Sequence, residues 1–105
     1  MGAETISGAE LDSSVNTAKQ TAAVFFWATW DGASRASMPT FEQVANANGY
    51  SLSFYKYDVD SDQATTTKFG IRSVPTIQLF KGGQVISQIV GAPTRTKLDA
   101  LVANA

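Results

Sequence analysis

The spacing of apolar positions changes along this chain, and each spacing predicts an element. Residues 22–28 are continuously apolar and rich in aromatic side chains, which is typical of a central strand covered on both faces. Residues 35–48 repeat apolar side chains at the three- and four-residue spacing of an amphipathic helix that stops at Gly49. Pro39 lies inside this helix and should kink it, because proline lacks an N–H and clashes with the preceding turn.

The N-terminal part predicts a short strand followed by a capped helix. The strand closes at residues 5–6. Ser7 and Glu10 have the spacing of a capping box, in which each side chain binds the other residue's backbone amide. The helix is expected to run to about Thr17, with two apolar side chains one turn apart, Leu11 and Val15.

The middle of the chain predicts a third strand and a short helix. Residues 51–59 carry the aromatic and aliphatic side chains of a strand. The acidic segment 60–62 should cap a helix that ends near Gly70, although three consecutive threonines, residues 65–67, are poor helix formers.

The C-terminal part predicts a hairpin and a final helix. Residues 76–81 and 84–90 are apolar runs joined by Gly82-Gly83, which is a hairpin signal. After a turn, Thr94 should cap a helix over residues 95–103.

The predicted element order is βαβαβαββα, which defines the fold class. The β-α-β-α-β half indicates parallel strands with right-handed crossovers, and the hairpin adds an antiparallel pair. We therefore expect an α/β fold, with a mixed central sheet and helices on both faces. A chain of 105 residues is one domain's worth, so residues 1–105 should form a single domain.

Charge and composition argue against several classes of partner. The net charge is −1, from 8 basic and 9 acidic side chains, which gives no electrostatic footprint for nucleic acid or an anionic membrane. No apolar run is long enough to span a bilayer, and no secretory signal is visible. We expect a soluble monomer with no certain partner, cytoplasmic if it is expressed in a cell.

Two absences limit the chemistry of this chain most. It contains no cysteine, which excludes disulfides, thiolate nucleophiles and thiolate metal sites. It contains no histidine, which removes the commonest general base and the commonest metal ligand. We expect no cofactor and no metal site.

Several short segments, in a fixed order, carry a resemblance to a known family. They are WATWDGAS at 27–34 with Pro39 beyond it, YKYDVD at 55–60, GIRSVPT at 70–76, FKGG at 80–83 and VGA at 90–92. Together they resemble thioredoxin over almost the whole chain, and the match looks closest to bacterial and plastid thioredoxins. The resemblance implies the thioredoxin fold and places Val74-Pro75 in the family's cis-proline loop.

The departures from this family pattern fall on its chemistry. The two cysteines of the family match Asp31 and Ser34, and the proline between them matches Ala33. The family's buried aspartate matches Phe25, so Lys56, which matches the lysine beside that aspartate, should lack its partner and move or extend to solvent. Because thiol–disulfide exchange needs an attacking thiolate and a resolving thiol, the redox reaction should be lost in full.

The resemblance also implies a shallow groove that pairs with extended peptide backbone in the family. Its matching positions here are Trp30, Gly32, Ala33, Val74, Pro75, Gly91 and Ala92. We expect this groove to be vestigial and to bind peptides weakly, because much of the family's hold on its substrates comes from the covalent intermediate. The alternative is purely structural, with Pro75 fixing its loop and Trp30 covering the start of a helix.

Asp31 and Ser34 have simpler explanations than catalysis. At a helix N-terminus, the Asp31 carboxylate would accept free amide hydrogens and interact favourably with the helix dipole, worth on the order of 1 kcal/mol. Ser34 would need a base to act as a nucleophile, and the neighbouring Arg35 stays protonated. The resemblance places one lysine, Lys56, in the vicinity. We expect no catalytic residue among them.

The segment 58–62 has aspartate at alternate positions, which suggests a calcium loop. The sixth and twelfth positions of such a loop require Gly and Glu, but here they hold Gln63 and Phe69. We therefore expect these acids to end a strand and cap a helix.

Three hypotheses for function follow. The first is an engineered or computationally designed thioredoxin-fold scaffold without native activity, because residues required by the backbone are kept while those required by the chemistry are gone. The second is a natural, non-catalytic peptide-binding module. The third is an enzyme of another class, such as a hydrolase acting through Ser34, which lacks a partner base.

Overall fold

The computed structural model describes residues 2–49 and 51–105, and in these residues five strands form one mixed sheet. The strands are β1 (Glu4–Thr5), β2 (Ala22–Trp27), β3 (Ser53–Asp58), β4 (Thr76–Lys81) and β5 (Gln84–Val90). Their order across the sheet is β1-β3-β2-β4-β5. β3 runs parallel to β1 and β2, whereas β4 is antiparallel to β2 and β5.

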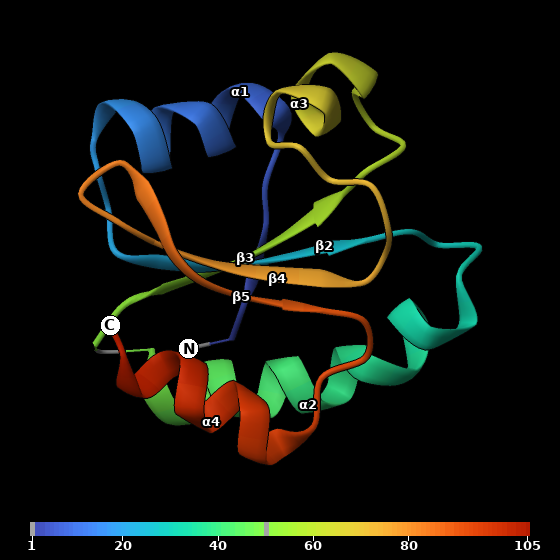
Figure 1. The fold of residues 1–105 in the computed structure, drawn as a ribbon, viewed down its shortest axis with the longest axis vertical. Coiled ribbons are helices and arrows are strands. Elements are labelled where there is room, and N and C mark those ends of the chain that lie inside the picture. The colour runs from blue at the N-terminus through green and yellow to red at the C-terminus, as the bar shows by residue number, and fades with distance from the viewer. Residues whose placement is uncertain (1, 50) are drawn as a thin grey trace.

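Helices cover both faces of this sheet. They are α1 (Gly8–Asp12), continued by the π-helical segment η1 (Ser13–Thr17), α2 (Gly32–Asn48), α3 (Gln63–Lys68) and α4 (Arg95–Ala103). Figure 1 shows α1 and α3 above the sheet and α2 and α4 below it. The predicted α/β class, with a mixed central sheet between two helical layers, is confirmed.

The continuous apolar run of β2 packs on both faces of the sheet, as its pattern predicts. Val24 and Phe26 face α1 and belong to one core cluster, whereas Ala23 and Phe25 face α2 and belong to the other. All four side chains are fully buried. Successive side chains of a strand point to opposite faces, so a central strand between two helical layers buries apolar side chains on both faces.

The element boundaries differ from the sequence expectation at four places. β2 ends at Trp27 rather than at residue 28, and β3 is shorter than the predicted 51–59. The helix expected to reach Thr17 loosens into η1 after Asp12, so the chain stays helical with wider turns. The long helix begins at Gly32 rather than 35, because Asp31 caps it.

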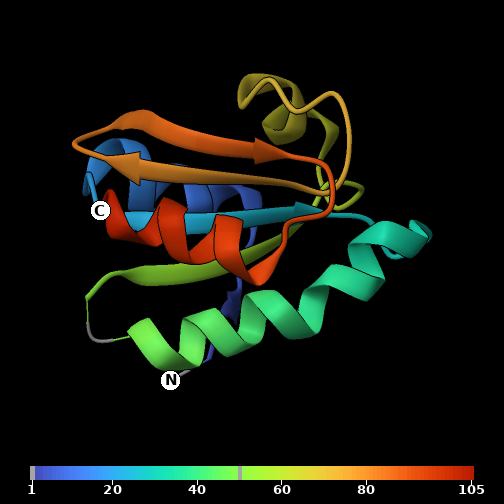
Figure 2. The same cartoon turned by 60° about the horizontal axis from the view of Figure 1, so that its bottom comes forward.

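Pro39 lies within α2, and the helix continues through it. Proline removes one hydrogen bond from the helical ladder, and Figure 2 shows α2 bent along its length. The helix ends at Asn48 with Gly49 as its C-cap, as predicted.

Side-chain caps fix the starts of the other helices where the sequence placed them. Ser7 and Glu10 form a complete capping box, with hydrogen bonds of 3.0 and 3.2 Å. Asp62 caps α3 by accepting the amide of Ala64, and Thr94 caps α4. These caps are local and depend on few residues, which is why the sequence predicted them.

Replacing Gly8 with alanine is expected to destabilise the protein by about 1–3 kcal/mol. Gly8 is buried where α1 crosses α3, and an added Cβ would lie 2.8 Å from the Asp62 carboxylate and still closer to the Thr65 hydroxyl. Both groups belong to the α3 cap and cannot retreat without breaking it. Urea unfolding measures the loss.

Gly32 provides the matched control for this variant. It is also a helical glycine, but a Cβ there would meet only the Arg35 guanidinium at 3.9 Å. Gly32→Ala should therefore leave the free energy of unfolding nearly unchanged. Equal losses in the two variants would show that helix packing at Gly8 is not the cause.

Candidate functional site

The residues between β2 and α2 form the turn where the sequence analysis placed the lost redox chemistry. Asp31 has extended backbone angles and is the N-cap of α2, with its carboxylate accepting the Ser34 amide at 2.8 Å. Its backbone carbonyl accepts the Arg35 amide at 3.1 Å. The prediction that Asp31 is a helix cap is confirmed.

Ser34 is fully buried in the first turn of α2 and is held by hydrogen bonds. Its hydroxyl donates to the Asp31 carboxylate at 2.8 Å and accepts the Ala28 amide at 3.4 Å. Asp31 accepts two hydrogen bonds from this one residue. A serine whose hydroxyl is shielded from solvent and bound to a capping carboxylate is poorly placed to attack a substrate, so the geometry argues against the hydrolase hypothesis.

Phe25 fills the position behind this turn with an aromatic ring. It is fully buried and stacks on Phe41 of α2, with ring centroids 5.0 Å apart and an interplanar angle of 19°. Phe41 in turn contacts Phe54 edge-on at 5.8 Å. The apolar replacement is therefore part of a continuous aromatic cluster between the sheet and α2.

Lys56 is paired, and the expectation that it lacks a partner is wrong. It lies opposite Phe25 in the β2–β3 register, and its ammonium forms an ion pair with Glu42 of α2 at 2.9 Å. The other Glu42 oxygen accepts the Ala3 amide at 2.9 Å. Glu42 thus ties the N-terminal segment, α2 and β3 together. This pair also commits Lys56, the lysine that the resemblance places in the vicinity of Ser34, to another residue.

Burial raises the pKa of Glu42, but the hydrogen bonds from Lys56 and the Ala3 amide outweigh it and hold that pKa below the ordinary value of 4.5. A carboxyl whose pKa is lowered by folding stabilises the native state above its unfolded pKa. That contribution to stability is lost as the pH falls through the pKa that the carboxyl has in the folded protein.

Glu42→Gln is therefore expected to lower the free energy of unfolding by about 1 kcal/mol at neutral pH. The difference from the parent should shrink as the pH falls below 4.5 and disappear below the folded pKa, where the parent carboxyl is protonated in the native state as well. Urea titrations between about pH 3 and 7 measure this. Glu4→Gln makes the same charge change on an exposed residue and should show little effect. A pH-independent deficit for Glu42→Gln would contradict the ion-pair explanation.

A shallow hollow lies beside the turn, and Trp30 forms part of its wall. The Trp30 side chain is 67 % exposed, and its indole N–H donates to the Asp60 carboxylate at 2.7 Å. The hollow has a volume of about 320 Å³. It is lined by Trp30, Asp31, Val59, Thr66, Ile71, Arg72, Ser73 and Val74.

The structure brings together part of the predicted groove. Trp30 and Val74 share the hollow, the Val74-Pro75 peptide bond is cis, and Pro75 accepts the Gly91 amide at 2.9 Å. Gly32, Ala33 and Ala92 do not line the hollow. Five lining residues were not predicted as part of the groove: Val59 after β3, Thr66 of α3, and Ile71, Arg72 and Ser73 of the loop that follows. Four of them lie inside the segments 55–60 and 70–76 that carry the family resemblance, which is the sequence signal that could have found them. Only the fold shows that they meet Trp30.

The three aspartates of segment 58–62 serve the local structure. Asp58 accepts the Asp60 amide at 2.9 Å, Asp60 accepts the Trp30 indole, and Asp62 caps α3. No group of three or more potential metal-ligating side chains is found within residues 2–49 and 51–105.

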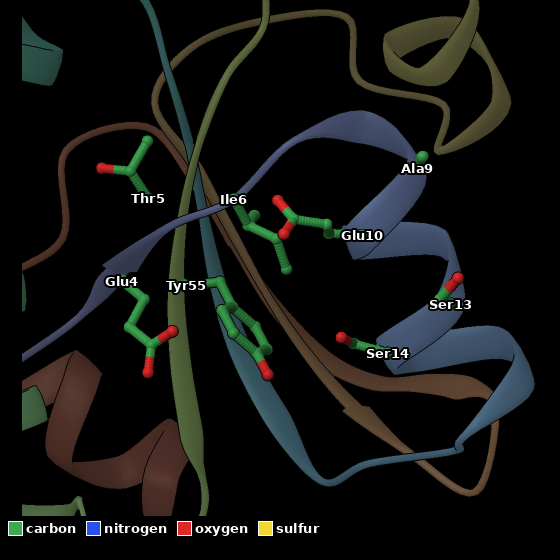
Figure 3. Close-up of a pocket in the computed structure, with 8 residues that line it drawn as sticks. All are labelled: Glu4, Thr5, Ile6, Ala9, Glu10, Ser13, Ser14 and Tyr55. Carbon is green, nitrogen blue, oxygen red and sulfur yellow. The ribbon is translucent and has the colours of Figure 1, made fainter.

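A second hollow, of about 400 Å³, lies between β1, α1 and β3 (Figure 3). Glu10 and Tyr55 line it, but Glu10 belongs to the capping box and the Tyr55 hydroxyl donates to Gln20 at 2.6 Å. These groups already serve the fold. The candidate site therefore remains at the start of α2.

Comparison with known proteins decides the family. The sequence profile described as Thioredoxin matches residues 2–104. This chain belongs to the thioredoxin family. It is 40 % identical to a thioredoxin of Alicyclobacillus acidocaldarius over 81 residues, which is 77 % of each chain. It is 37 % identical to one of Rhodospirillum rubrum over 93 residues, 89 % of each chain. The crystal structure of Malassezia sympodialis thioredoxin has a TM-score of 0.87 at 34 % identity, covering 99 % of this chain and 91 % of that one.

Unlike a redox-active thioredoxin, this chain has no dithiol. It contains no cysteine, and its turn holds a carboxylate and a hydroxyl that cannot exchange with a disulfide. Thioredoxin-type disulfide reduction is therefore not possible in this protein. In residues 2–49 and 51–105, no helix has both the length and the apolar character needed to cross a membrane.

Proposed function

We propose that this protein is an engineered or designed thioredoxin-fold scaffold with no native activity. The observation that carries the proposal is the packing of the side chains behind the lost redox site. Phe25 stacks on Phe41 where the family has a buried acid, and Lys56 pairs with Glu42 instead. The position of the family's acid is filled by a fully buried aromatic ring, and Lys56 has a partner in Glu42.

The turn itself supports the same proposal. Asp31 caps α2 and binds Ser34, so the substituted residues stabilise the helix start. A procedure that selects for folding and ignores catalysis favours such replacements. Such a procedure keeps residues that the backbone conformation requires, such as Pro75 in its cis loop and Gly91, which has a φ of +96°.

Two measurements test this proposal. Insulin reduction with dithiothreitol should proceed at the uncatalysed rate, and turnover above that rate would overturn the proposal. A residue-by-residue comparison with thioredoxins of single lineages tests whether this chain is designed or natural. Matches scattered evenly between lineages support design, whereas a close natural neighbour contradicts it.

The exposed Trp30 favours a second candidate function, a non-catalytic peptide-binding module. Trp30, Ile71 and Val74 give the hollow an apolar wall, and aromatic side chains that stay exposed are common at recognition sites. A phage-displayed library of short peptides is a suitable probe. Under this function, a selected peptide binds with a Kd of about 1 μM.

Trp30→Ala should then weaken binding of that peptide by at least about tenfold. Val85→Ala, which also removes an exposed apolar side chain but on β5, should leave the affinity unchanged. If no peptide is enriched, or if both variants bind as the parent does, the groove has no binding function.

A further inference from the structure

The helix α2 ends on an asparagine that a glycine follows. Asn48 is the last helical residue, and Gly49 is the C-cap. The chain has four asparagines, and Asn48 is the one that precedes glycine. Because glycine has no Cβ, the peptide nitrogen of Gly49 is sterically open to the side chain before it. Approach of that nitrogen to Cγ of Asn48 closes a five-membered ring.

The backbone amide of Gly49 is not held by the hydrogen bonds of the helix. The C-cap amides of α1, α3 and α4 each donate to a carbonyl of their own helix. Within residues 2–49 and 51–105, the Gly49 amide has no such acceptor. The ends of helices also open more readily than their middles. The nitrogen of Gly49 is therefore available to react.

The side chain of Asn48 lines a surface hollow between α2 and α4. Asn48 is half-buried, and its Nδ2 donates to the Val44 carbonyl at 2.9 Å. The hollow has a volume of about 390 Å³ and is lined by Asn48, Ser51, Asp99, Val102, Ala103 and Ala105. A hollow of this size gives the side chain room to turn away from Val44 and admits water to its carbonyl carbon.

We propose that Asn48-Gly49 is a site of spontaneous deamidation. The Gly49 nitrogen gives its proton to hydroxide or a buffer base and forms a bond to Cγ of Asn48. The bond from Cγ to Nδ2 breaks, and Nδ2 leaves as ammonia with a proton from water. The resulting succinimide ring is opened by water at either carbonyl, which leaves an aspartate or an isoaspartate at position 48. The net reaction consumes one water and releases one ammonia.

The product weakens the end of α2. A carboxylate has no N–H to donate, so the Val44 carbonyl loses its side-chain partner. The new negative charge lies at the C-terminus of a helix, where the dipole disfavours anions. It also enters the hollow that Asp99 lines. Deamidation is therefore a one-way step that loosens the last turn of α2 and makes the net charge more negative than −1.

Incubation of the purified protein at mildly alkaline pH, followed by tandem mass spectrometry, tests this proposal. Residue 48 should gain one dalton, and ion exchange should resolve a form with one more negative charge. Asn46 is the internal control, because it is exposed in the same helix but precedes alanine. Asn48 should react several-fold faster than Asn46, and its rate should rise with pH. The proposal is overturned if Asn48 stays intact or reacts no faster than Asn46.

Gly49→Ala tests the role of the glycine without changing the helix end. Gly49 has a φ of −63°, a helical value that alanine also adopts. The added methyl group hinders the nitrogen, so deamidation at Asn48 should fall to the level of Asn46. Equal rates in the parent and in Gly49→Ala would overturn the proposed attack.

Asn48→Asp reproduces the charge of one product and tests its effect on stability. Its midpoint of urea unfolding should lie below that of the parent. Asn46→Asp makes the same charge change on an exposed side chain of the same turn and should shift the midpoint less. Equal shifts would contradict the role assigned to the hydrogen bond between Asn48 and Val44.

Discussion

Replacing Asp31 and Ser34 together with cysteine is expected to give this chain dithiothreitol-dependent insulin reduction, which the parent lacks. The Ser34 hydroxyl lies 2.8 Å from the Asp31 carboxylate, so the two introduced sulfur atoms would be within reach of each other. The N-terminus of α2 favours negative charge at position 31. A thiol pKa lowered by one unit there gives roughly tenfold more thiolate at neutral pH than a free cysteine has.

The two single cysteine variants are the controls for this gain of activity. Each supplies an attacking thiol or a resolving thiol but not both, so neither should turn over. If the double variant forms its disulfide and still fails to reduce insulin, more than the sulfur atoms has been lost. The next variant to make would then add Phe25→Asp, which restores the family's buried acid.

Phe25→Asp is expected to cause the largest loss of stability of any change considered, about 3–5 kcal/mol. It removes a fully buried ring that stacks on Phe41 and places a carboxylate in its space. Lys56 lies opposite in the register, but it already pairs with Glu42. Urea unfolding at neutral pH measures the loss.

The pH dependence separates the cost of the charge from the cost of the cavity. Burial raises the pKa of a carboxyl, so the charge penalty is present above the folded pKa and disappears as the pH falls below the unfolded one. Phe25→Leu keeps an apolar side chain and should cost about 1.5 kcal/mol or less at any pH. Equal stability of the two variants would mean that Lys56 leaves Glu42 for the new carboxylate.

Much of the fold follows from local rules that the sequence displays directly. The continuous apolar run of β2 has to be covered on both sides, and the caps at Ser7, Asp31 and Thr94 each satisfy amides within three residues. The loss of redox chemistry follows from composition alone, since no arrangement of this chain contains a thiol.

Partners that lie far apart along the chain are decided by the tertiary structure. Nothing local indicates that Lys56 pairs with Glu42, because the contact forms only once α2 packs across the sheet. The hollow beside Trp30 is likewise completed by the loop after α3, and the edge position of β5 depends on the strand order. The sequence by itself therefore determined the elements, their caps and the missing reaction, which depend on neighbouring residues. Packing alone decided which distant side chains meet, because those contacts depend on how the elements are arranged in space.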